Sequence, residues 1–346
     1  MTHGAEVERM TDIFQLTRQL VDIDSVTNYE SAVGEFLLET LAPLAARFSG
    51  KVERCPVTAD RFNVFAHWGN PVVTLSTHMD TVPPFFPSRE DADFIWGRGS
   101  ADAKGIIASM MGAAEGLLES GVRNFALLFV VGEERNSAGA YAAAENPRGS
   151  HFLINGEPTQ NKLALATKGI IRFEIEARGK LAHSAYPELG ESAIEKLLDA
   201  LQEIRKMRLP RDRLLGASTV NIGVISGGRA PNVVPDSAMA EIAIRLVGDP
   251  EPVREAMVRA VGKRAEVHEI LCIPAIRFDR LDGFETSIVA YTTDVPAFGD
   301  SWGKPYLLGP GNIHVAHTSE ERVLKKELVD ASGIYQQMVK KLLALT

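Results

Sequence analysis

Val72-Val73-Thr74-Leu75-Ser76-Thr77-His78-Met79-Asp80 is a short apolar run that ends in a histidine and an aspartate. Two later runs follow the same plan, since residues 125–131 lead to Glu133-Glu134 and residues 152–154 lead to Glu157. Apolar runs of this length, bounded by polar residues, favour buried β-strands. In open α/β sheets ligands bind outside the carboxyl ends of the strands, so we expect these side chains to converge on one crevice.

The segments between these runs show the apolar spacing of helices, most clearly at residues 104–118 and 138–144. Strands that alternate with helices predict a mostly parallel sheet with helices on both faces. Further elements are expected on either side of this core, as helices at 7–24, 30–48 and 327–343 and strands at 52–57 and 63–67.

The pattern changes near Lys168, from where short alternating strands replace the continuous apolar runs. The expected order is strand 170–177, helix 192–207, strands 219–225 and 238–246, helix 252–261 and strand 265–273. This β-α-β-β-α-β order is that of a ferredoxin-like unit. At 346 residues the chain is long enough for two domains. We therefore predict an α/β catalytic domain, residues 1–167 and 277–346, interrupted by an inserted α+β lid or dimerisation domain, residues 168–276.

Composition narrows the possible partners and the possible metal ligands. A formal net charge of -8 argues against a nucleic-acid or anionic-membrane partner, because such partners favour basic surfaces. The two cysteines, Cys55 and Cys272, lie far apart, so a disulfide framework or a thiolate zinc site is not expected. A metal would be held by nitrogen and oxygen. The polar N-terminus and the lack of a long apolar run predict a cytoplasmic protein.

A two-metal hydrolytic site needs a carboxylate that touches both ions, further ligands for each ion and a base beside the bound water. Asp102 precedes an expected helix and could simply cap it, although capping alone does not explain the preceding Gly97-Arg98-Gly99-Ser100. Asp80 lies two residues after His78 and could orient that imidazole, since ligating histidines usually donate their other N–H to a carboxylate.

Two choices stay open at this level. Either Glu133 or Glu134 could be a ligand while the other serves as the base, and their adjacency does not separate the roles. His314 and His317 compete in the same way, because both follow one Gly/Pro-rich loop.

Six motifs, taken in order, resemble the dizinc aminoacylase/carboxypeptidase family of metallopeptidases. That family includes acetylornithine deacetylase, succinyl-diaminopimelate desuccinylase and carboxypeptidase G. The motifs are THMDTVP at 77–83, GRGSADAKG at 97–105, GEERNSAG at 132–139, GEPT at 156–159, AHSAYP at 182–187 and GPGNIHVAH at 309–317. They span most of the chain.

The resemblance implies a role for each candidate ligand. His78, Asp102 and Glu157 would hold one divalent ion, and Asp102, Glu134 and His317 would hold the other, so that Asp102 is the bridge. Glu133 would be the general base, and Asp80 a catalytic residue that orients His78. The implied ions are zinc, with cobalt or manganese as alternatives, since such nitrogen/oxygen sites accept all three.

The resemblance also implies substrate contacts. His183 would polarise the scissile carbonyl, in dimeric relatives from across the subunit interface. Arg245 would grip a substrate carboxylate with its planar fork, although a salt bridge on the strand face is an equal alternative. Asn232 and Gly311 would contact the substrate, but many relatives carry an acid where Asn312 follows Gly311.

The sequence thus predicts a metal-dependent hydrolase that cleaves the amide bond of an N-acyl amino acid. A metal-bridging hydroxide would attack the carbonyl, with Glu133 as base. The alternatives are a dipeptidase or exo-carboxypeptidase with the same chemistry, and a catalytically silent metal- or amino-acid-binding relative. The expected partners are a small substrate with an amide and a carboxylate, and a second copy bound through the inserted domain.

Overall fold

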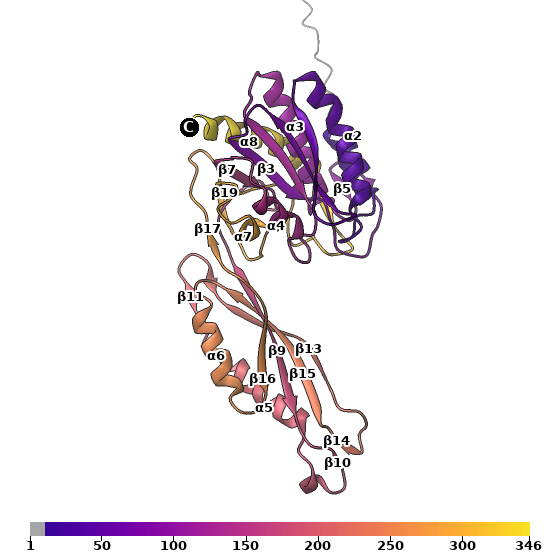
Figure 1. Ribbon diagram of the computed structural model, residues 1–346, viewed down its shortest axis with the longest axis vertical. Helices are drawn as coiled ribbons and strands as arrows, with labels where there is room; N and C mark the ends of the chain where they lie inside the picture. Colours follow the sequence, from indigo (N-terminus) through magenta and orange to yellow (C-terminus); the bar gives the residue numbers. More distant parts are fainter. Residues whose placement is uncertain (1–10) are drawn as a thin grey trace, which may run out of the picture. The chain divides into compact units, whose positions relative to one another are not determined.

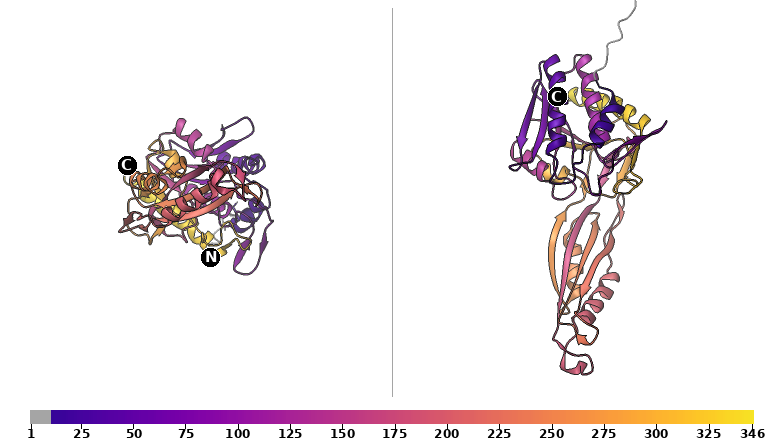
Figure 2. Two further views of the ribbon diagram at one scale, coloured as in Figure 1. Left: turned by 90° about the horizontal axis from the view of Figure 1, so that it is seen from below. Right: turned by 90° about the vertical axis from the view of Figure 1, so that its right-hand side faces the viewer.

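The computed structural model describes residues 11–346 and divides into two compact units (Figures 1 and 2). Unit 1 comprises the chain up to Leu165 together with Phe278–Ser287 and Thr293–Thr346. Unit 2 comprises Ala166–Arg277 and Ile288–Thr292. The first residues of the helix predicted at 7–24 lie outside the described part. No helix within residues 11–346 is both long enough and apolar enough to cross a membrane.

Unit 1 is built on a six-stranded sheet. Its order is β1 (Lys51–Pro56), β2 (Phe62–Trp68), β6 (Phe125–Val130), β3 (Val73–His78), β7 (Phe152–Asn155) and β19 (Lys304–Leu307). The four strands from β6 to β19 run parallel, whereas β1 and β2 are antiparallel additions at one edge. The predicted α/β class with a mostly parallel sheet is confirmed.

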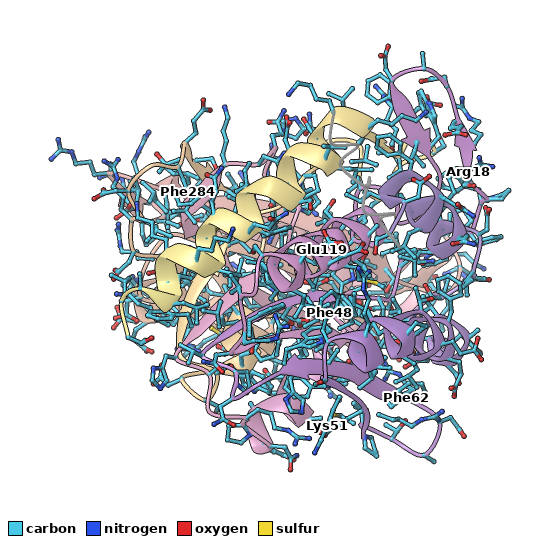
Figure 3. All side chains as sticks on the ribbon, turned by 90° about the horizontal axis from the view of Figure 1, so that it is seen from above. Arg18, Phe48, Lys51, Phe62, Glu119 and Phe284 are labelled. Carbon is cyan, nitrogen blue, oxygen red and sulfur yellow. The ribbon has the colours of Figure 1, made fainter. Side chains whose placement is uncertain are left out.

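Helices cover both faces of this sheet. One face packs against α1 (Ile13–Val21), α2 (Ser31–Arg47), α3 (Lys104–Glu119) and α8 (Lys325–Leu343), and Figure 3 shows α8 beside the helix that ends at Glu119. The other face packs against α4 (Ala138–Glu145) and α7 (Val295–Phe298). Strand β6 is apolar throughout because it is buried on both faces. Its alternate side chains enter opposite cores: Phe125, Leu127 and Phe129 pack into one core, and Ala126, Leu128 and Val130 pack into the other.

Unit 2 has the predicted β-α-β-β-α-β order. Its elements are β9 (Gly169–Arg178), α5 (Ala193–Arg205), β13 (Thr219–Gly227), β15 (Ser237–Leu246), α6 (Glu251–Val261) and β16 (Glu266–Ile273). The strands form an antiparallel sheet in the order β13-β15-β9-β16, and both helices pack on its apolar face. The inserted ferredoxin-like unit is therefore confirmed.

Short strands and the one-turn helix α7 form the parts of the fold that the sequence did not predict. Besides β19 they include β4 (Arg89–Glu90), β5 (Phe94–Trp96), β8 (Leu163–Thr167), β10 (Ala182–His183), β11 (Arg211–Asp212), β12 (Gly216–Ala217), β14 (Val233–Val234), β17 (Ile276–Arg277), β18 (Thr286–Val289) and β20 (Arg322–Leu324). Runs of two to five residues are too short to show a period, so only their pairing partners define them.

Candidate metal centre

Three neighbouring strands carry acidic or imidazole groups to one edge of the sheet in unit 1. His78 is the last residue of β3, which lies between β6 and β7. The Glu133-Glu134 pair follows β6, and Glu157 follows β7. Because these strands are parallel, their carboxyl ends lie at the same edge of the sheet, as the sequence predicts.

The side chains form overlapping groups whose ligand atoms all lie within 4.8 Å of one another. The groups are His78, Asp102 and Glu157; Asp102, Glu134 and His317; and His78, Glu133 and Glu134. Each could hold a metal ion, because nitrogen and carboxylate oxygen are ordinary ligands of divalent transition metals. Within residues 11–346, His314 belongs to no such group. The structure thus places His317, and not His314, in the cluster.

Asp102 lies at the centre of this arrangement. One carboxylate oxygen, Oδ1, is 2.9 Å from Nε2 of His78, and the other, Oδ2, is 3.5 Å from Nε2 of His317. His317 Nε2 is also 3.0 Å from Oε1 of Glu134. The two oxygens of Asp102 therefore face two different histidines, which is the geometry that a bridging carboxylate requires.

Asp80 contacts more residues of the candidate metal centre than its position after His78 indicates. The Nδ1 atom of His78 lies 3.0 Å from the Asp80 carbonyl oxygen but 3.6 Å from its carboxylate. The buried carboxylate instead accepts hydrogen bonds of 2.8 to 3.2 Å from the Thr27 hydroxyl and from the backbone N–H groups of Gly132, Glu133 and Glu134. Asp80 therefore fixes both the histidine and the turn that carries the two glutamates.

The electrostatics are those of a cation site. Burial raises the pKa of Glu133 and of Glu157 well above the ordinary value, and neighbouring carboxylates add to the shift. Burial also disfavours the charge of Asp102, but hydrogen bonds from His317 and His78 lower its pKa overall. The same contact with Asp102, together with Glu134, raises the pKa of His317 to about 10. Bound cations would offset the mutual repulsion of these carboxylates.

Asp294 is a buried acid near this cluster that the sequence analysis missed. It is 1% exposed, and neither carboxylate oxygen has a hydrogen bond of normal geometry within residues 11–346. Burial raises the pKa of Asp294 to about 7, although the hydroxyl of Ser137 and the imidazole of His78 oppose this shift. Asp294 follows no apolar strand, so no signal in the sequence marked it.

Gly311 lies beside Ala101, the residue before Asp102. A side chain there would come within 3.4 Å of the Ala101 backbone, and its φ of 93° is a conformation that favours glycine. Its N–H donates to Oε2 of Glu327 at 2.8 Å, and its carbonyl accepts from the N–H of Gln160 at 2.9 Å. Both backbone groups are engaged, and the substrate contact of Gly311 stays a prediction.

His183 and Asn232 lie together in unit 2. Strands β10 and β14 pair His183 with Val233, and the carbonyl of Asn232 accepts the Ser184 N–H at 3.0 Å. The N–H of Ala185 donates to Nδ1 of His183 at 3.1 Å, so Nε2 carries the proton of a neutral ring. His183 is exposed, so this Nε2–H is available to a ligand.

Arg245 has an unusual environment for a strand arginine. Its Nη1 atom is buried and has no hydrogen-bond partner in the described part of the chain. Burial alone lowers the pKa of Arg245, without a nearby acid to oppose it. Within residues 11–346 the Nη1 atom therefore gives no support to a salt bridge on the strand face, and the substrate contact of Arg245 stays a prediction.

Arg245 and His183 lie at opposite ends of the sheet in unit 2. Strand β10, which contains His183, pairs with β14, and the chain enters β15 at Ser237 shortly after β14 (Figure 1). Arg245 is at the far end of β15, where it pairs with Thr219 and Ile170. At about 3.3 Å per residue, Ser237 and Arg245 are about 26 Å apart. One small molecule cannot contact both His183 and Arg245 of the same chain.

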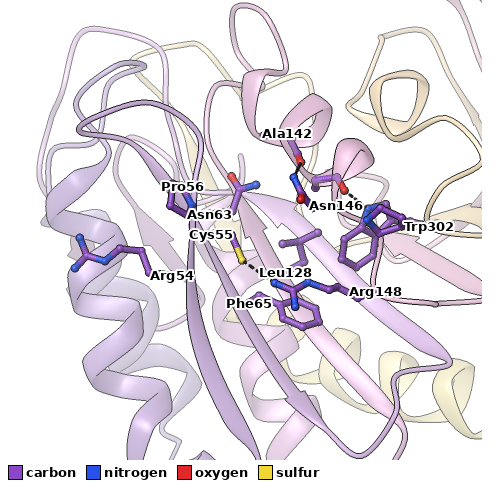
Figure 4. Close-up of a pocket in the computed structure, with 12 residues that line it drawn as sticks. Arg54, Cys55, Pro56, Asn63, Phe65, Leu128, Ala142, Asn146, Arg148 and Trp302 are labelled. Carbon is purple, nitrogen blue, oxygen red and sulfur yellow. Dashed lines mark hydrogen bonds between the residues drawn. The ribbon is translucent and has the colours of Figure 1, made fainter.

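A separate cavity of about 390 Å³ opens in unit 1 on the face of the sheet that packs against α4 and α7 (Figure 4). Phe65, Leu128 and Trp302 provide apolar walls, and Arg54 and Arg148 line it as well. Both arginines are paired, with Glu35 and Glu53 respectively. None of the predicted ligands lines this cavity.

Comparison with known proteins places this chain in a family. Residues 165–269 match the family model of the peptidase dimerisation domain. A Peptidase M20 domain-containing protein of Schizosaccharomyces pombe is 36% identical, over 98% of this chain and 87% of that protein. A probable carboxypeptidase of Aspergillus niger is 38% identical, over 93% of this chain and 88% of that protein.

Solved structures share the fold at lower identity. Aminopeptidase PepT of Bacillus cereus has a TM-score of 0.77 at 22% identity and covers 96% of this chain and 100% of its own. A dinuclear metal-binding M20 peptidase of Bacillus subtilis has a TM-score of 0.71 at 16% identity, over 97% and 98%. The fold and the relatives define a metallohydrolase that acts on peptide or amide bonds. The chain belongs to the M20 peptidase family, and the resemblance seen in its motifs is confirmed.

We expect the metal-free protein to lose stability as the pH rises from about 5 to about 7. Burial raises the pKa of Glu133, Glu157 and Asp294 above the ordinary values of 4.5 and 3.8. Above those values the folded state binds more protons than the unfolded state, so its stability falls with rising pH. Asp80 and Asp102 have a lowered pKa, so they change the pH dependence of stability only below this pH range.

Urea unfolding in the presence of a chelator measures this loss. It should reach about 2 kcal/mol from Asp294 alone, since its pKa of about 7 keeps it protonated over most of the window and each pKa unit is worth about 1.4 kcal/mol. Excess Co²⁺ should remove the loss, since metal binding displaces the protons. Equal stability at both pH values without metal would contradict the proposed charge cluster.

Proposed function

We propose that this chain is a two-metal hydrolase that cleaves the amide bond of an N-acyl amino acid with a free carboxylate. The central position of Asp102 carries the proposal, because each of its oxygens faces a different histidine. In this proposal His78 and Glu157 complete one metal site, and Glu134 and His317 complete the other. The Bacillus subtilis relative, which is described as a dinuclear metal-binding peptidase, supports the number of ions.

Two bound divalent ions would polarise the scissile carbonyl and lower the pKa of a water to about 7. Glu133 would take a proton from that water and then give it to the departing amide nitrogen. The raised pKa of the half-buried Glu133 suits the first step, because it makes the carboxylate a stronger base toward the water, and the protonated side chain can then pass the proton to the nitrogen. The products are the free carboxylic acid and the free amino acid.

Arg245 would bind the substrate carboxylate through its guanidinium, whose Nη1 atom has no hydrogen-bond partner within residues 11–346. His183 would donate its Nε2–H to the scissile carbonyl, beside Asn232. Within one chain, Ser237 at the β14 end of β15 is already about 26 Å from Arg245, so His183 would have to come from a second copy. The match to a peptidase dimerisation domain supports a homodimer.

The second candidate is an exo-carboxypeptidase or dipeptidase, which the name of the Aspergillus niger relative favours. It needs the same carboxylate and the same metals and differs only in the acyl group, which would be an aminoacyl residue. A silent binding protein is disfavoured, because Glu133 would have no task there. Zinc as the native metal and a cytoplasmic location stay predictions.

A panel of N-acetyl amino acids and free dipeptides, assayed with Co²⁺ or Zn²⁺, separates the two candidates. Turnover of acetylated substrates above dipeptides is the expected result, and the reverse order would favour the peptidase. In either case, replacing the substrate carboxylate by a carboxamide should lower kcat/KM about tenfold to hundredfold, because a charge-assisted hydrogen bond is lost. Equal turnover of acids and amides would contradict the role of Arg245.

A further inference from the structure

A second buried carboxylate holds the segment that carries Asp102. Glu321 is 1% exposed and lies between the turn that contains His317 and strand β20. Its Oε1 atom accepts the backbone N–H groups of Gly99, Ala101 and Asp102, at 2.9, 3.3 and 3.2 Å. Its Oε2 atom pairs with Nη1 of Arg98 at 2.5 Å.

Glu321 contacts both ends of the segment 97–102. The backbone carbonyl of Glu321 accepts the N–H of Gly97 at 3.1 Å, and the side chain binds the segment as far as Asp102. Arg98 is itself buried, with Nε donating to the Pro84 carbonyl at 3.3 Å and its guanidinium 5.0 Å from the Phe86 ring. Glu321 therefore has one acceptor for the backbone and one for a fixed cation.

We propose that Glu321 is a positioning residue that sets the place of Asp102 for both metal ions at once. Asp102 is the residue shared by the His78–Glu157 group and the Glu134–His317 group. A shift of the 97–102 segment would therefore disturb both groups together, whereas loss of a ligand such as His317 disturbs one. This inference rests on the proposed two-metal function.

Glu321→Gln is a sharp test, because glutamine keeps the length of the side chain but replaces one acceptor oxygen by an NH2 donor. That donor must face either Arg98 or the backbone N–H groups of the segment, and both of these are donors too. Glu320→Gln is the matched control, since Glu320 is the adjacent glutamate and is exposed.

Titration with Co²⁺ alone, followed by calorimetry and by the visible spectrum of the bound ion, measures the affinity of each site. Glu321→Gln should weaken both sites about tenfold to hundredfold, the usual effect of losing a group that orients a ligand. Glu320→Gln should match the natural protein, and His317→Ala should weaken one site only. Unchanged affinity in Glu321→Gln, or a loss at one site alone, overturns the proposal.

If Glu321→Gln shows no cooperative thermal unfolding, Arg98→Lys gives the same reading, since lysine keeps the charge but not the fork that aligns Glu321. Arg98→Lys should weaken Co²⁺ binding at both sites to a smaller extent. If both sites bind Co²⁺ as tightly as in the natural protein, the proposal is overturned. The proposed function is tested separately: if the natural protein itself binds fewer than two Co²⁺ ions, that function fails, whatever the variants do.

Discussion

Glu133→Gln should abolish nearly all turnover while both metal ions stay bound. Glutamine keeps the shape of the side chain but cannot accept a proton from the attacking water. The loss of a positioned general base costs about 10²- to 10⁴-fold in rate. The backbone N–H of Glu133 would still donate to Asp80, so the turn keeps its place. Steady-state kinetics and metal analysis of the purified variant measure the two effects.

Glu134→Gln is the matched comparison, because it changes the adjacent side chain in the same way. Glu134 contacts His317 at 3.0 Å and shares a group with Asp102, so this variant should lose one ion. Glu133 also belongs to one possible group, with His78 and Glu134. Loss of metal in Glu133→Gln would therefore make Glu133 a ligand, and retained activity would remove it as the base.

Asp102→Ala should release both ions from a protein that remains folded. The variant removes the one carboxylate that faces both His78 and His317, and each remaining group keeps only one carboxylate beside its histidine. Metal content should fall from two ions per chain to nearly none, and activity should fall with it. Metal analysis after dialysis measures the change, with a circular dichroism spectrum as the control for folding.

A variant that keeps two ions would exclude Asp102 as the bridge. His317→Ala separates this result from a general weakening of the site, because His317 belongs to one group only and its loss should leave one ion. The ratio of the metal lost in Asp102→Ala to the metal lost in His317→Ala is thus more informative than either loss alone.

The sequence predicted the members of the candidate metal centre where a local pattern marked them. His78 and Glu157 each follow an apolar strand, and sheets of parallel strands bring such positions together. Spacing did not separate His314 from His317, because both lie within one short loop. The structure separates them by the backbone, since His317 has a φ of 63° and its ring reaches Glu134.

The residues that hold the ligands in place were harder to predict. Asp80 contacts Gly132 across 52 residues, because β3 and β6 are neighbours in the sheet, and the strand order is not written in either segment. Glu321 reaches Gly99 across 222 residues. Ligands follow local patterns, whereas their supports depend on tertiary contacts.

The length of β15 has a genetic consequence under the proposed arrangement. If Arg245 and His183 of one catalytic site belong to different copies, no single chain contains a complete site, and each chain serves two. A copy that lacks His183 and a copy that lacks Glu133 would then restore each other in a mixed pair, because one of the two sites receives both intact residues. Two recessive defects in one gene would complement, although neither chain functions by itself.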